Sequence, residues 1–217
     1  MRRLVAVAVL AFGLGGCEDV VQGNGVAAQE TRTVRSFEGA VANDGVALTL
    51  DAANGEPGTL VVSADENLLG LVVTQVQSGW LTVRTTKPVS SPIGITVKGP
   101  APGLLKVGAN TGGMATATGV DVAGTFEVAV AGGGTVTVTG ETDRLDVLAS
   151  GGSVLHARDL TAREVRVLTA SGGSRVEVCA TSALHAAASG GSMVTYACEP
   201  SVVEPVTSGG AVVRKAE

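Results

Sequence analysis

The chain has 217 residues, of which 31 are glycine, while aromatic residues make up only 2% and hydrophobic residues 45%. This hydrophobic share excludes a disordered chain, and the shortage of aromatic side chains excludes a large aromatic core. The formal net charge of −5 lacks the basic footprint that nucleic-acid phosphates require, so no nucleic-acid partner is expected. No segment after Leu14 reaches the length of about 18 uninterrupted apolar residues that a membrane-spanning helix needs.

The N-terminus has the three parts of a secretory signal. Residues 1–3 carry two arginines, residues 4–13 are apolar, and residues 14–17 read Leu-Gly-Gly-Cys. This last motif resembles the lipobox of bacterial lipoproteins, which implies cleavage before Cys17, diacylation of its thiol and acylation of the new amine. The alternative is an ordinary signal peptide followed by a chance cysteine.

A lipobox divides the chain into three parts. Residues 1–16 would be the signal peptide, residues 17–29 the lipidated cysteine with a short tether, and residues 30–217 a single domain. Two or three acyl chains would hold the protein at the membrane permanently, because each buried CH₂ contributes about 0.8 kcal/mol. Retention at the inner membrane is associated with aspartate after the cysteine, whereas Glu18 stands here. The outer membrane is therefore favoured, with the domain facing the periplasm or the cell surface.

A corner of one small residue and two glycines recurs from residue 111 onward. Successive corners begin 20, 19, 21, 18 and 19 residues apart, and the repeats fill residues 111–213. A sharp bend between strands needs positive φ, which glycine adopts without strain. The glycines predicted to form these structural turns are Gly112, Gly113, Gly132, Gly133, Gly151, Gly152, Gly172, Gly173, Gly190, Gly191, Gly209 and Gly210.

Apolar and polar residues alternate on both sides of each corner. Phe126, Val128 and Val130 precede one corner, and Val136 and Val138 follow it. This period of two predicts strands with one buried face. The spacing of 21 residues before the corner at 171–173 breaks the register, and one residue inserted at a bulge or corner would restore it.

A repeat of this length cannot bury its own apolar face, so the copies must stack. We therefore predict an all-β fold, a right-handed parallel β-helix-like solenoid with turns of about 19–20 residues. Ten turns would form a rod of roughly 48 Å. The Leu-x-x-Leu-x-Leu ladder of leucine-rich repeats is absent, and an antiparallel β-sandwich remains the alternative. The hydroxyls of Ser150, Ser171, Ser189 and Ser208 are expected to form a ladder along the corners.

Four short motifs in the first half are separated by irregular strand-like segments. They are Gly23-Asn24-Gly25, residues 34–40, residues 64–69 and residues 79–83. In this order, and followed by Ser-Gly-Gly repeats, they resemble the head GIN domain of autotransporter-adhesin-like proteins, a bacterial family of unknown function. The resemblance covers about residues 23–213. It implies a β-helix-like stack of strands in an exported or lipid-anchored chain, without established catalytic residues.

Few residues of the chain are of the types that bind metals, form disulfides or catalyse reactions. His156 and His185 lie at different offsets from their corners, and neither belongs to a cluster of residues with metal-ligand spacing. They are therefore interpreted as exposed residues without a functional role. Neither a metal nor a cofactor is expected. Cys179 and Cys198 are 19 residues apart, which places them on adjacent rungs at about 4.8 Å, within the range of a disulfide. Their offsets from the corners differ by one residue, so their side chains could also point to opposite faces.

Two functions fit the pattern. The first is a lipid-anchored cell-envelope protein whose β-helical head acts without catalysis as a structural, adhesion or interaction module. Its expected partners are the membrane through the anchor, an envelope protein or glycan, and further copies of the chain. The second is a polysaccharide lyase or hydrolase, which needs clustered carboxylates and usually aromatic platforms. Only Glu127 and Asp146 lie one repeat apart on the outward face, so we predict that the protein is not an enzyme.

The lipobox makes a direct prediction for Cys17. Fatty-acid labelling of the expressed chain should be lost in Cys17→Ala, because the acylated thiol and amine both belong to this residue. Labelling of the variant equal to that of the wild type would contradict the motif reading.

Overall fold

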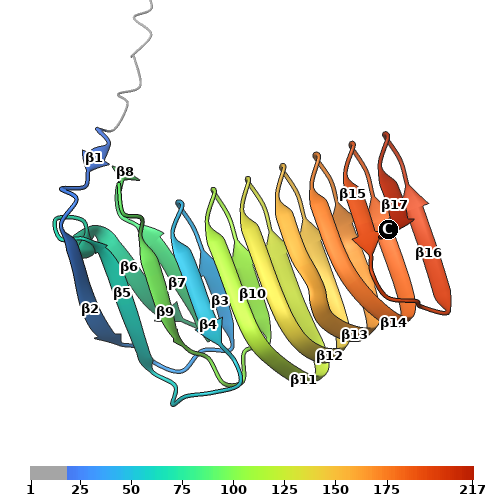
Figure 1. The fold of residues 1–217 in the computed structure, drawn as a ribbon, viewed down its shortest axis with the longest axis horizontal. Helices are drawn as coiled ribbons and strands as arrows, with labels where there is room; N and C mark the ends of the chain where they lie inside the picture. Colours follow the sequence, from blue (N-terminus) through green and yellow to red (C-terminus); the bar gives the residue numbers. More distant parts are fainter. Residues whose placement is uncertain (1–18) are drawn as a thin grey trace, which may run out of the picture.

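The structure is a computed structural model that describes residues 19–217, so the signal peptide and Cys17 lie outside the described residues. The described chain contains strands and one short 3₁₀ helix but no α-helix (Figure 1). This confirms the predicted all-β solenoid. The elements are β1 (Val21–Gln22), β2 (Ala27–Thr33), β3 (Gly39–Ala42), β4 (Ala47–Asp51), β5 (Thr59–Asp65), η1 (Leu69–Leu71), β6 (Val72–Gln77), β7 (Trp80–Thr85), β8 (Val89–Ser90), β9 (Thr96–Pro100), β10 (Lys106–Ala109), β11 (Met114–Val130), β12 (Thr135–Ala149), β13 (Val154–Ala170), β14 (Arg175–Ala188), β15 (Met193–Tyr196), β16 (Val202–Thr207) and β17 (Val212–Lys215).

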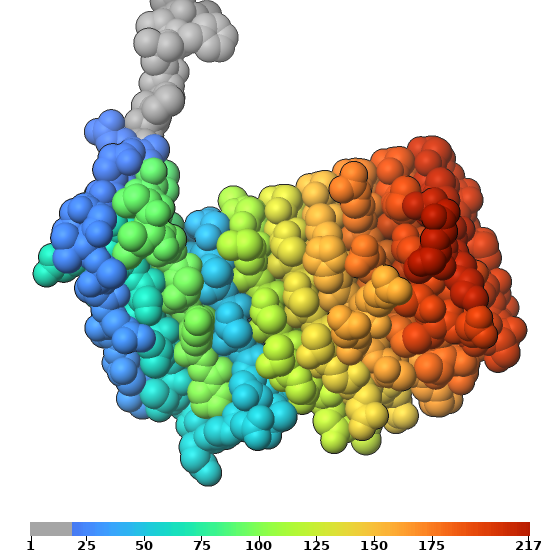
Figure 2. All heavy atoms as spheres, viewed as in Figure 1, coloured from blue at the N-terminus to red at the C-terminus, as the bar shows by residue number. Residues whose placement is uncertain are grey.

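Each regular turn consists of a strand after the glycine corner, a bend, and a strand before the next corner. In β11 to β14 both strands belong to one long element that bends in the middle, and each element pairs in parallel with the next. We call the two halves the post-corner and pre-corner strands. They stack into the two faces of the coil, and the successive turns follow one another along the long axis (Figures 1 and 2).

The number of turns is smaller than predicted. The solenoid has about six turns rather than ten, because much of the first half pairs in antiparallel fashion and forms an N-terminal cap. Within the cap β2 pairs with β5, β5 with β9, and β6 with β7. The β6–β7 hairpin closes through Ser78 and Gly79 with φ of 49° and 79°, the two positive values that a two-residue hairpin turn requires.

The segment expected to be a tether is part of this cap. β1 pairs with β8, and β2 begins at Ala27. Asp65 is fully buried and accepts hydrogen bonds from the Gly25 amide at 2.6 Å and from the Ser91 hydroxyl. A buried carboxylate needs such donors, so residues 21–29 are fixed to the domain and the predicted tether is corrected.

Two of the family motifs meet at this point. The Asn67 side chain accepts a hydrogen bond from the Asn24 amide at 3.0 Å and donates one to the Gln22 carbonyl at 2.8 Å. A Cβ at position 23 would overlap the Asp65 carboxyl, so glycine is needed for the close approach. The motifs at 23–25 and 64–69 therefore form one structural joint.

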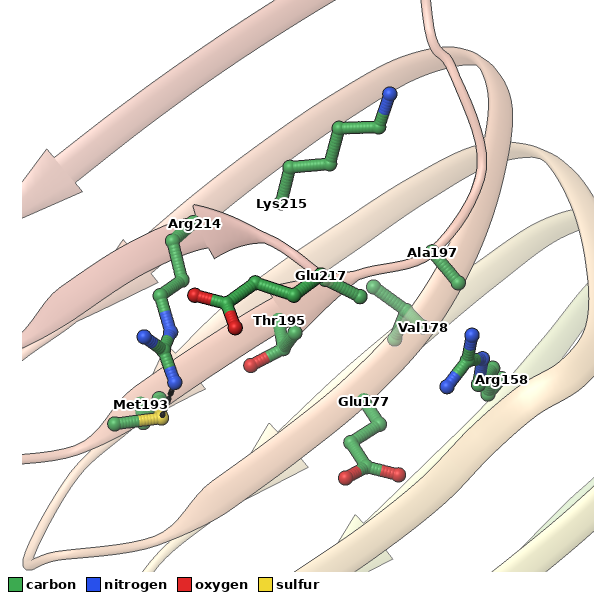
Figure 3. A pocket seen from close by; sticks show the side chains of 10 residues that line it. Arg158, Glu177, Val178, Met193, Thr195, Ala197, Arg214, Lys215 and Glu217 are labelled. Carbon is green, nitrogen blue, oxygen red and sulfur yellow. Dashed lines mark hydrogen bonds between the residues drawn. The ribbon is translucent and has the colours of Figure 1, made fainter.

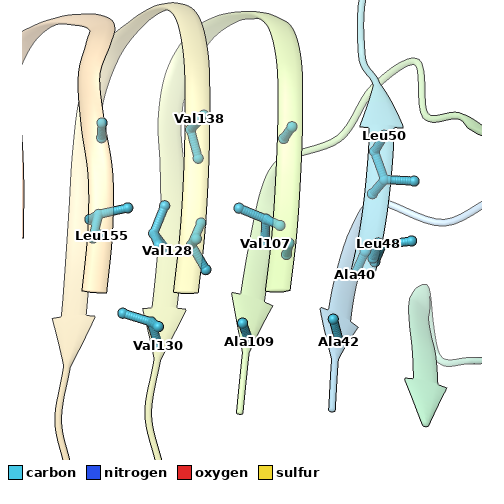
Figure 4. Close-up of a cluster of buried hydrophobic side chains, with 14 of the residues drawn as sticks. Ala40, Ala42, Leu48, Leu50, Val107, Ala109, Val128, Val130, Val138 and Leu155 are labelled. Atoms are coloured by element: carbon cyan, nitrogen blue, oxygen red, sulfur yellow. The ribbon is translucent and has the colours of Figure 1, made fainter. Parts of the chain in front are cut away.

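The core is a narrow column filled by alternate residues of both faces. Val128 and Val130 from a pre-corner strand belong to the same buried cluster as Val138 and Leu155 from post-corner strands (Figure 4). Phe37 and Phe126 are the aromatic residues of the buried core among residues 19–217. Valine, alanine and leucine fill the remaining layers, which explains why so few aromatic residues suffice.

The corners are tight turns that stack on one another. Both central residues of the turn at 150–153 are glycines with positive φ, 64° at Gly151 and 72° at Gly152, as in type I′ turns. Amides and carbonyls of the corner glycines also pair between turns, for example Gly152 N–H with Gly172 C=O at 2.9 Å. All the predicted corner glycines except Gly113 have positive φ.

The corner at 110–113 is shifted by one residue from its predicted position. Gly113 aligns with Gly134, since Met114 pairs with Thr135, and Thr111 takes a φ of 52° where Gly132 stands in the next turn. A β-branched residue rarely adopts this conformation, so the corner pattern cannot be aligned from the glycines alone.

The serine ladder is also corrected. The buried serines are those that follow the glycine pairs: Ser153 donates to the Val130 carbonyl at 3.1 Å, and Ser192 donates to the Ala170 carbonyl at 2.8 Å. Each bond joins a hydroxyl to a carbonyl near the preceding corner. The hydroxyls of Ser153 and Ser192 therefore bond to backbone carbonyls rather than to other serines, and the Ser174 hydroxyl is buried without a hydrogen-bond partner.

The predicted register break is a bulge at Leu168. Val147 pairs with Val167, whereas Leu148 pairs with Thr169, which leaves Leu168 as the inserted residue. Because the two residues between the inward Val167 and Ala170 both point outward, Leu168 is 50% exposed. The insertion keeps the core pattern and adds an apolar side chain to the surface.

Cys179 and Cys198 are joined in a disulfide, with their Cα atoms 4.8 Å apart. The Ala197 amide donates to the Val178 carbonyl at 2.9 Å, after which the chain leaves the strand. This change of direction brings the Cys198 side chain towards Cys179 despite the different offsets from the corners. The disulfide covalently links the last two turns of the solenoid.

The bend glycine of β12 allows a stability test. Gly140 has a φ of 129°, and a Cβ there would overlap the Val120 carbonyl, so Gly140→Ala should lower the free energy of unfolding by about 1–3 kcal/mol. Gly124→Ala is the control, since its Cβ would meet no atom within 4 Å. Denaturant midpoints measure both, and equal values for the two variants would contradict the analysis.

The disulfide is tested by thiol titration of the unfolded, unreduced chain carrying Cys17→Ala. No free thiol is expected, and the bond should contribute about 3 kcal/mol because it closes a loop of ~20 residues. Two free thiols in protein isolated from the envelope would show that the bond does not form.

Candidate functional site

The outward side of the pre-corner strands carries two neighbouring rows of residues. Each turn of the solenoid, or rung, contributes one residue to each row. The charged row consists of Lys106, Glu127, Asp146, Arg166, His185 and Glu204. The apolar row beside it consists of Gly108, Ala129, Leu148, Leu168, Ala187 and Val206. Strand pairing keeps the charged row in line from β10 to β16. In the apolar row Leu148 pairs with Thr169, and Leu168 is the bulged residue before Thr169. Together we call them the row face.

Trp80 stands at the cap end of the row face. Its indole is 38% exposed and lies over Gly39, where a Cβ would come within 2.9 Å of the ring. Glycine at this position allows the ring to lie flat on the sheet. Of the aromatic residues that the structure describes, Trp80 is the one with an exposed ring.

A groove runs from Trp80 to the two exposed leucines of the apolar row. It has a volume of about 250 Å³, and Leu148 and Leu168 line its far end. They are 48% and 50% exposed. Alternation along the strands places Gly108 and Ala129 outward between the two ends, so the floor is low because its side chains are small. Exposed apolar groups gathered in this way make the groove a candidate interaction site.

Ion pairs link the charges of the row face. Lys106 lies 3.2 Å from Glu127, and His185 lies 2.9 Å from Glu204. Each pair joins side chains on adjacent rungs. All of these groups are partly exposed, so each pair contributes little to stability and mainly fixes the side-chain positions.

Glu164 is the most enclosed acid of this network. Its carboxylate contacts the Arg166 guanidinium at 2.5 Å and Arg144 at 3.5 Å, and its side chain is 17% exposed. The hydrogen bond from Arg166 lowers the pKa of Glu164 below its ordinary value, against the opposing effect of desolvation, with further help from the charges of Arg166, Arg144 and His185. The sequence did not reveal this residue, because its partners come from two strands and become neighbours only through the bulged register.

Glu127 and Asp146 are the acids on which an enzyme would have to depend. They lie opposite each other on adjacent strands, but Glu127 is held by Lys106. Asp146 Oδ1 is buried and takes no hydrogen bond. Two adjacent like charges destabilise a sheet, so the pair leaves negative charge on the row face that the neighbouring side chains only partly balance.

A second depression lies on the post-corner face near the C-terminal end (Figure 3). It has a volume of about 300 Å³ and is lined by Arg158, Arg214 and Glu177 among others. Of the charges that line it, Glu177 pairs with His156 at 3.0 Å, and Lys215 pairs with Glu199. The hydrogen bond between Lys215 and Glu199 raises the pKa of the lysine and lowers that of the glutamate. This depression lacks an exposed aromatic or leucine side chain.

The two histidines are exposed, as expected, but each pairs with a glutamate on the next rung. Within residues 19–217, histidine, cysteine and acidic side chains form no group of three or more that could hold a metal ion. In the same range no helix has the length and apolarity needed to cross a membrane.

Comparisons with known proteins agree with this architecture. A family model described as "Putative auto-transporter adhesin, head GIN domain" matches residues 36–200. None of the curated proteins compared with the chain matches it.

Solved structures share the fold at low sequence identity. A "putative adhesin" from Bacteroides fragilis has a TM-score of 0.69 at 17% identity, covering 90% of this chain and 100% of its own. A "putative adhesin" from Parabacteroides merdae has a TM-score of 0.53 at 18% identity, with 92% and 100% covered. A "putative lipid binding protein" from Parabacteroides distasonis has a TM-score of 0.51 at 17% identity, with the same coverage. At these identities the likeness extends to the fold alone.

Glu164 allows a test of the charge network. Because its pKa is lowered in the folded state, its stabilising effect is present above the unfolded pKa and is lost as the pH falls through the folded pKa. Glu164→Gln should therefore lower the free energy of unfolding at pH 7 by about 0.5–1 kcal/mol, with a difference that vanishes in acid. Glu56→Gln, in the exposed loop after β4, is the control. A pH-independent difference for Glu164→Gln would contradict the electrostatic explanation.

Proposed function

The chain belongs to the family described as "Putative auto-transporter adhesin, head GIN domain", and from this membership we propose that it is a lipid-anchored cell-envelope protein whose solenoid acts without catalysis as an adhesion module. The proposed anchor is Cys17, and the outer membrane is the proposed location. The row face is the surface through which the module binds.

One observation carries the proposal: exposed apolar side chains gather beside a groove on the pre-corner strands. Trp80, Leu148 and Leu168 border this groove, and tryptophan is enriched among the residues that dominate binding energy. Strands stacked on both sides hold these side chains in place. A preformed surface loses little entropy on binding.

The arrangement of acids favours binding over turnover. Glu127 is paired with Lys106 at 3.2 Å, and Leu148 and Leu168 border the groove beside it. A polysaccharide-degrading enzyme instead needs two carboxylates on either side of the bond to be cleaved, with a space for the sugar between them. That activity remains the alternative to be tested.

Adhesion is tested with cells that display the chain. Leu148→Glu should reduce retention of these cells on immobilised envelope fragments several-fold, because it places a charge in the groove. Met114→Glu is the matched control: Met114 is 49% exposed on the post-corner face, against 48% for Leu148.

Envelope fractionation and protease shaving of intact cells should first establish that both variants reach the surface in equal amounts. Retention unchanged in Leu148→Glu would contradict the proposal. Release of oligosaccharides from an acidic polysaccharide by the purified chain would instead support the enzyme alternative.

A further inference from the structure

We propose that the row face binds the row face of a second copy of this chain, with the two solenoid axes antiparallel. This inference rests on the proposed function, since it names the partner of the same surface. The pairing has a two-fold axis that lies in the interface along the strand direction and passes between β12 and β13. Each rung then faces a rung counted from the opposite end of the row.

The charged row is complementary to itself when reversed. In chain order its charges are positive, negative, negative, positive, histidine and negative. Reversal therefore brings Lys106 opposite Glu204 of the partner subunit and Glu127 opposite His185 of the partner subunit. At the centre Asp146 faces Arg166 of the partner subunit. No like charges face each other in the row.

The charged residues two positions before Asp146 and Arg166 are also complementary to themselves when the order of the rungs is reversed. Arg144 on β12 is paired in register with Glu164 on β13, so the two-fold axis brings each of them opposite the other residue of the partner subunit. The four central charges, Arg144, Asp146, Glu164 and Arg166, thus form a self-complementary patch. Complementary charge fixes the register of an interface and excludes shifted pairings.

The apolar row is complementary to itself in size. Reversal places Leu148 opposite Thr169 of the partner subunit, because Thr169 is its register partner within the chain, and the bulged Leu168 of the partner subunit lies beside this contact. Ala129 lies opposite Ala187 of the partner subunit. At the ends Gly108 faces Val206 of the partner subunit. Val206 is 72% exposed, and Gly108 carries no side chain that would oppose it.

Asp146 supplies a further reason for a partner. Glu127 and Asp146 lie side by side on adjacent strands, and within the chain Arg166 is directed to Glu164 at 2.5 Å. In the pair these acids face His185 of the partner subunit and Arg166 of the partner subunit. Association thus gives an arginine partner to Asp146, whose Oδ1 is buried and takes no hydrogen bond within one copy.

The size of the contact predicts a weak, multivalent interaction. Six rungs span about 24 Å, and five residues of each strand span about 17 Å, which gives a footprint of roughly 400 Å² per copy. The two copies together would bury about 800 Å², below the roughly 1,200 Å² of stable interfaces and in the range of weak, transient contacts, so many anchored copies are needed for strong attachment. The antiparallel arrangement places the two N-terminal caps at opposite ends of the pair, which suits contact between two surfaces.

A charge exchange tests the pairing. Asp146→Arg alone and Arg166→Asp alone each bring like charges together at the two-fold axis, so each variant should associate at least tenfold more weakly than the wild type. An equimolar mixture of the two variants restores opposite charges at both central contacts and should form a heterodimer. Sedimentation of the full chain carrying Cys17→Ala measures this, and Arg175→Asp on the post-corner face is the matched control.

The mixture separates association from folding, since a misfolded variant would not be rescued by the other. Monomers of the wild type at millimolar concentration, or variants that associate like the wild type, would overturn the pairing. If such monomers still mediate Leu148-dependent retention on envelope fragments, the adhesion proposal stands with a different partner. Dimers that fail in that retention assay would support the pairing and contradict the adhesion proposal.

Discussion

The whole structure depends on parallel backbone pairing between successive turns. A single turn of this length buries its apolar residues only when another turn lies on each side, and its amides and carbonyls find partners only on those neighbours. Pairing fixes the rung spacing at about 4.8 Å and leaves a column too narrow for many aromatic side chains. The glycine corners are part of the same constraint, because Gly152 and Gly172 bond through their backbones and side chains at Gly151 and Gly172 would crowd the turn beside them.

The same parallel pairing creates the row face and also leaves an open strand edge at the end of the solenoid. Residues in register on successive rungs stand in straight rows, so a few substitutions can produce a continuous patch such as the row face. The last strands expose an edge, which invites uncontrolled pairing. Ser208 N–H points to β14, and since amide directions alternate along a strand, the nitrogen of Pro205 faces the open edge, where proline offers no donor.

Much of the repeat could be predicted from the sequence because its signals are local. Alternating residues such as Phe126, Val128 and Val130 revealed the buried face, and the irregular spacing before Ser171 revealed the bulge at Leu168. The cap could not be predicted, since its antiparallel pairs join distant segments, and Asp65 holds Gly25 across 40 residues. The charge network around Glu164 was also missed, because a one-residue error in register changes every neighbour of a side chain.

Native-state hydrogen exchange tests the stacking account most directly. If each turn is stabilised by its neighbours, amides of β11, β12 and β13, which are paired on both sides, should exchange far more slowly than those of β16 and β17, which have one open edge. Within the last turns, amides facing β14 and β15 should be better protected than those facing the edge. Equal protection of β12 and β17 would contradict the account.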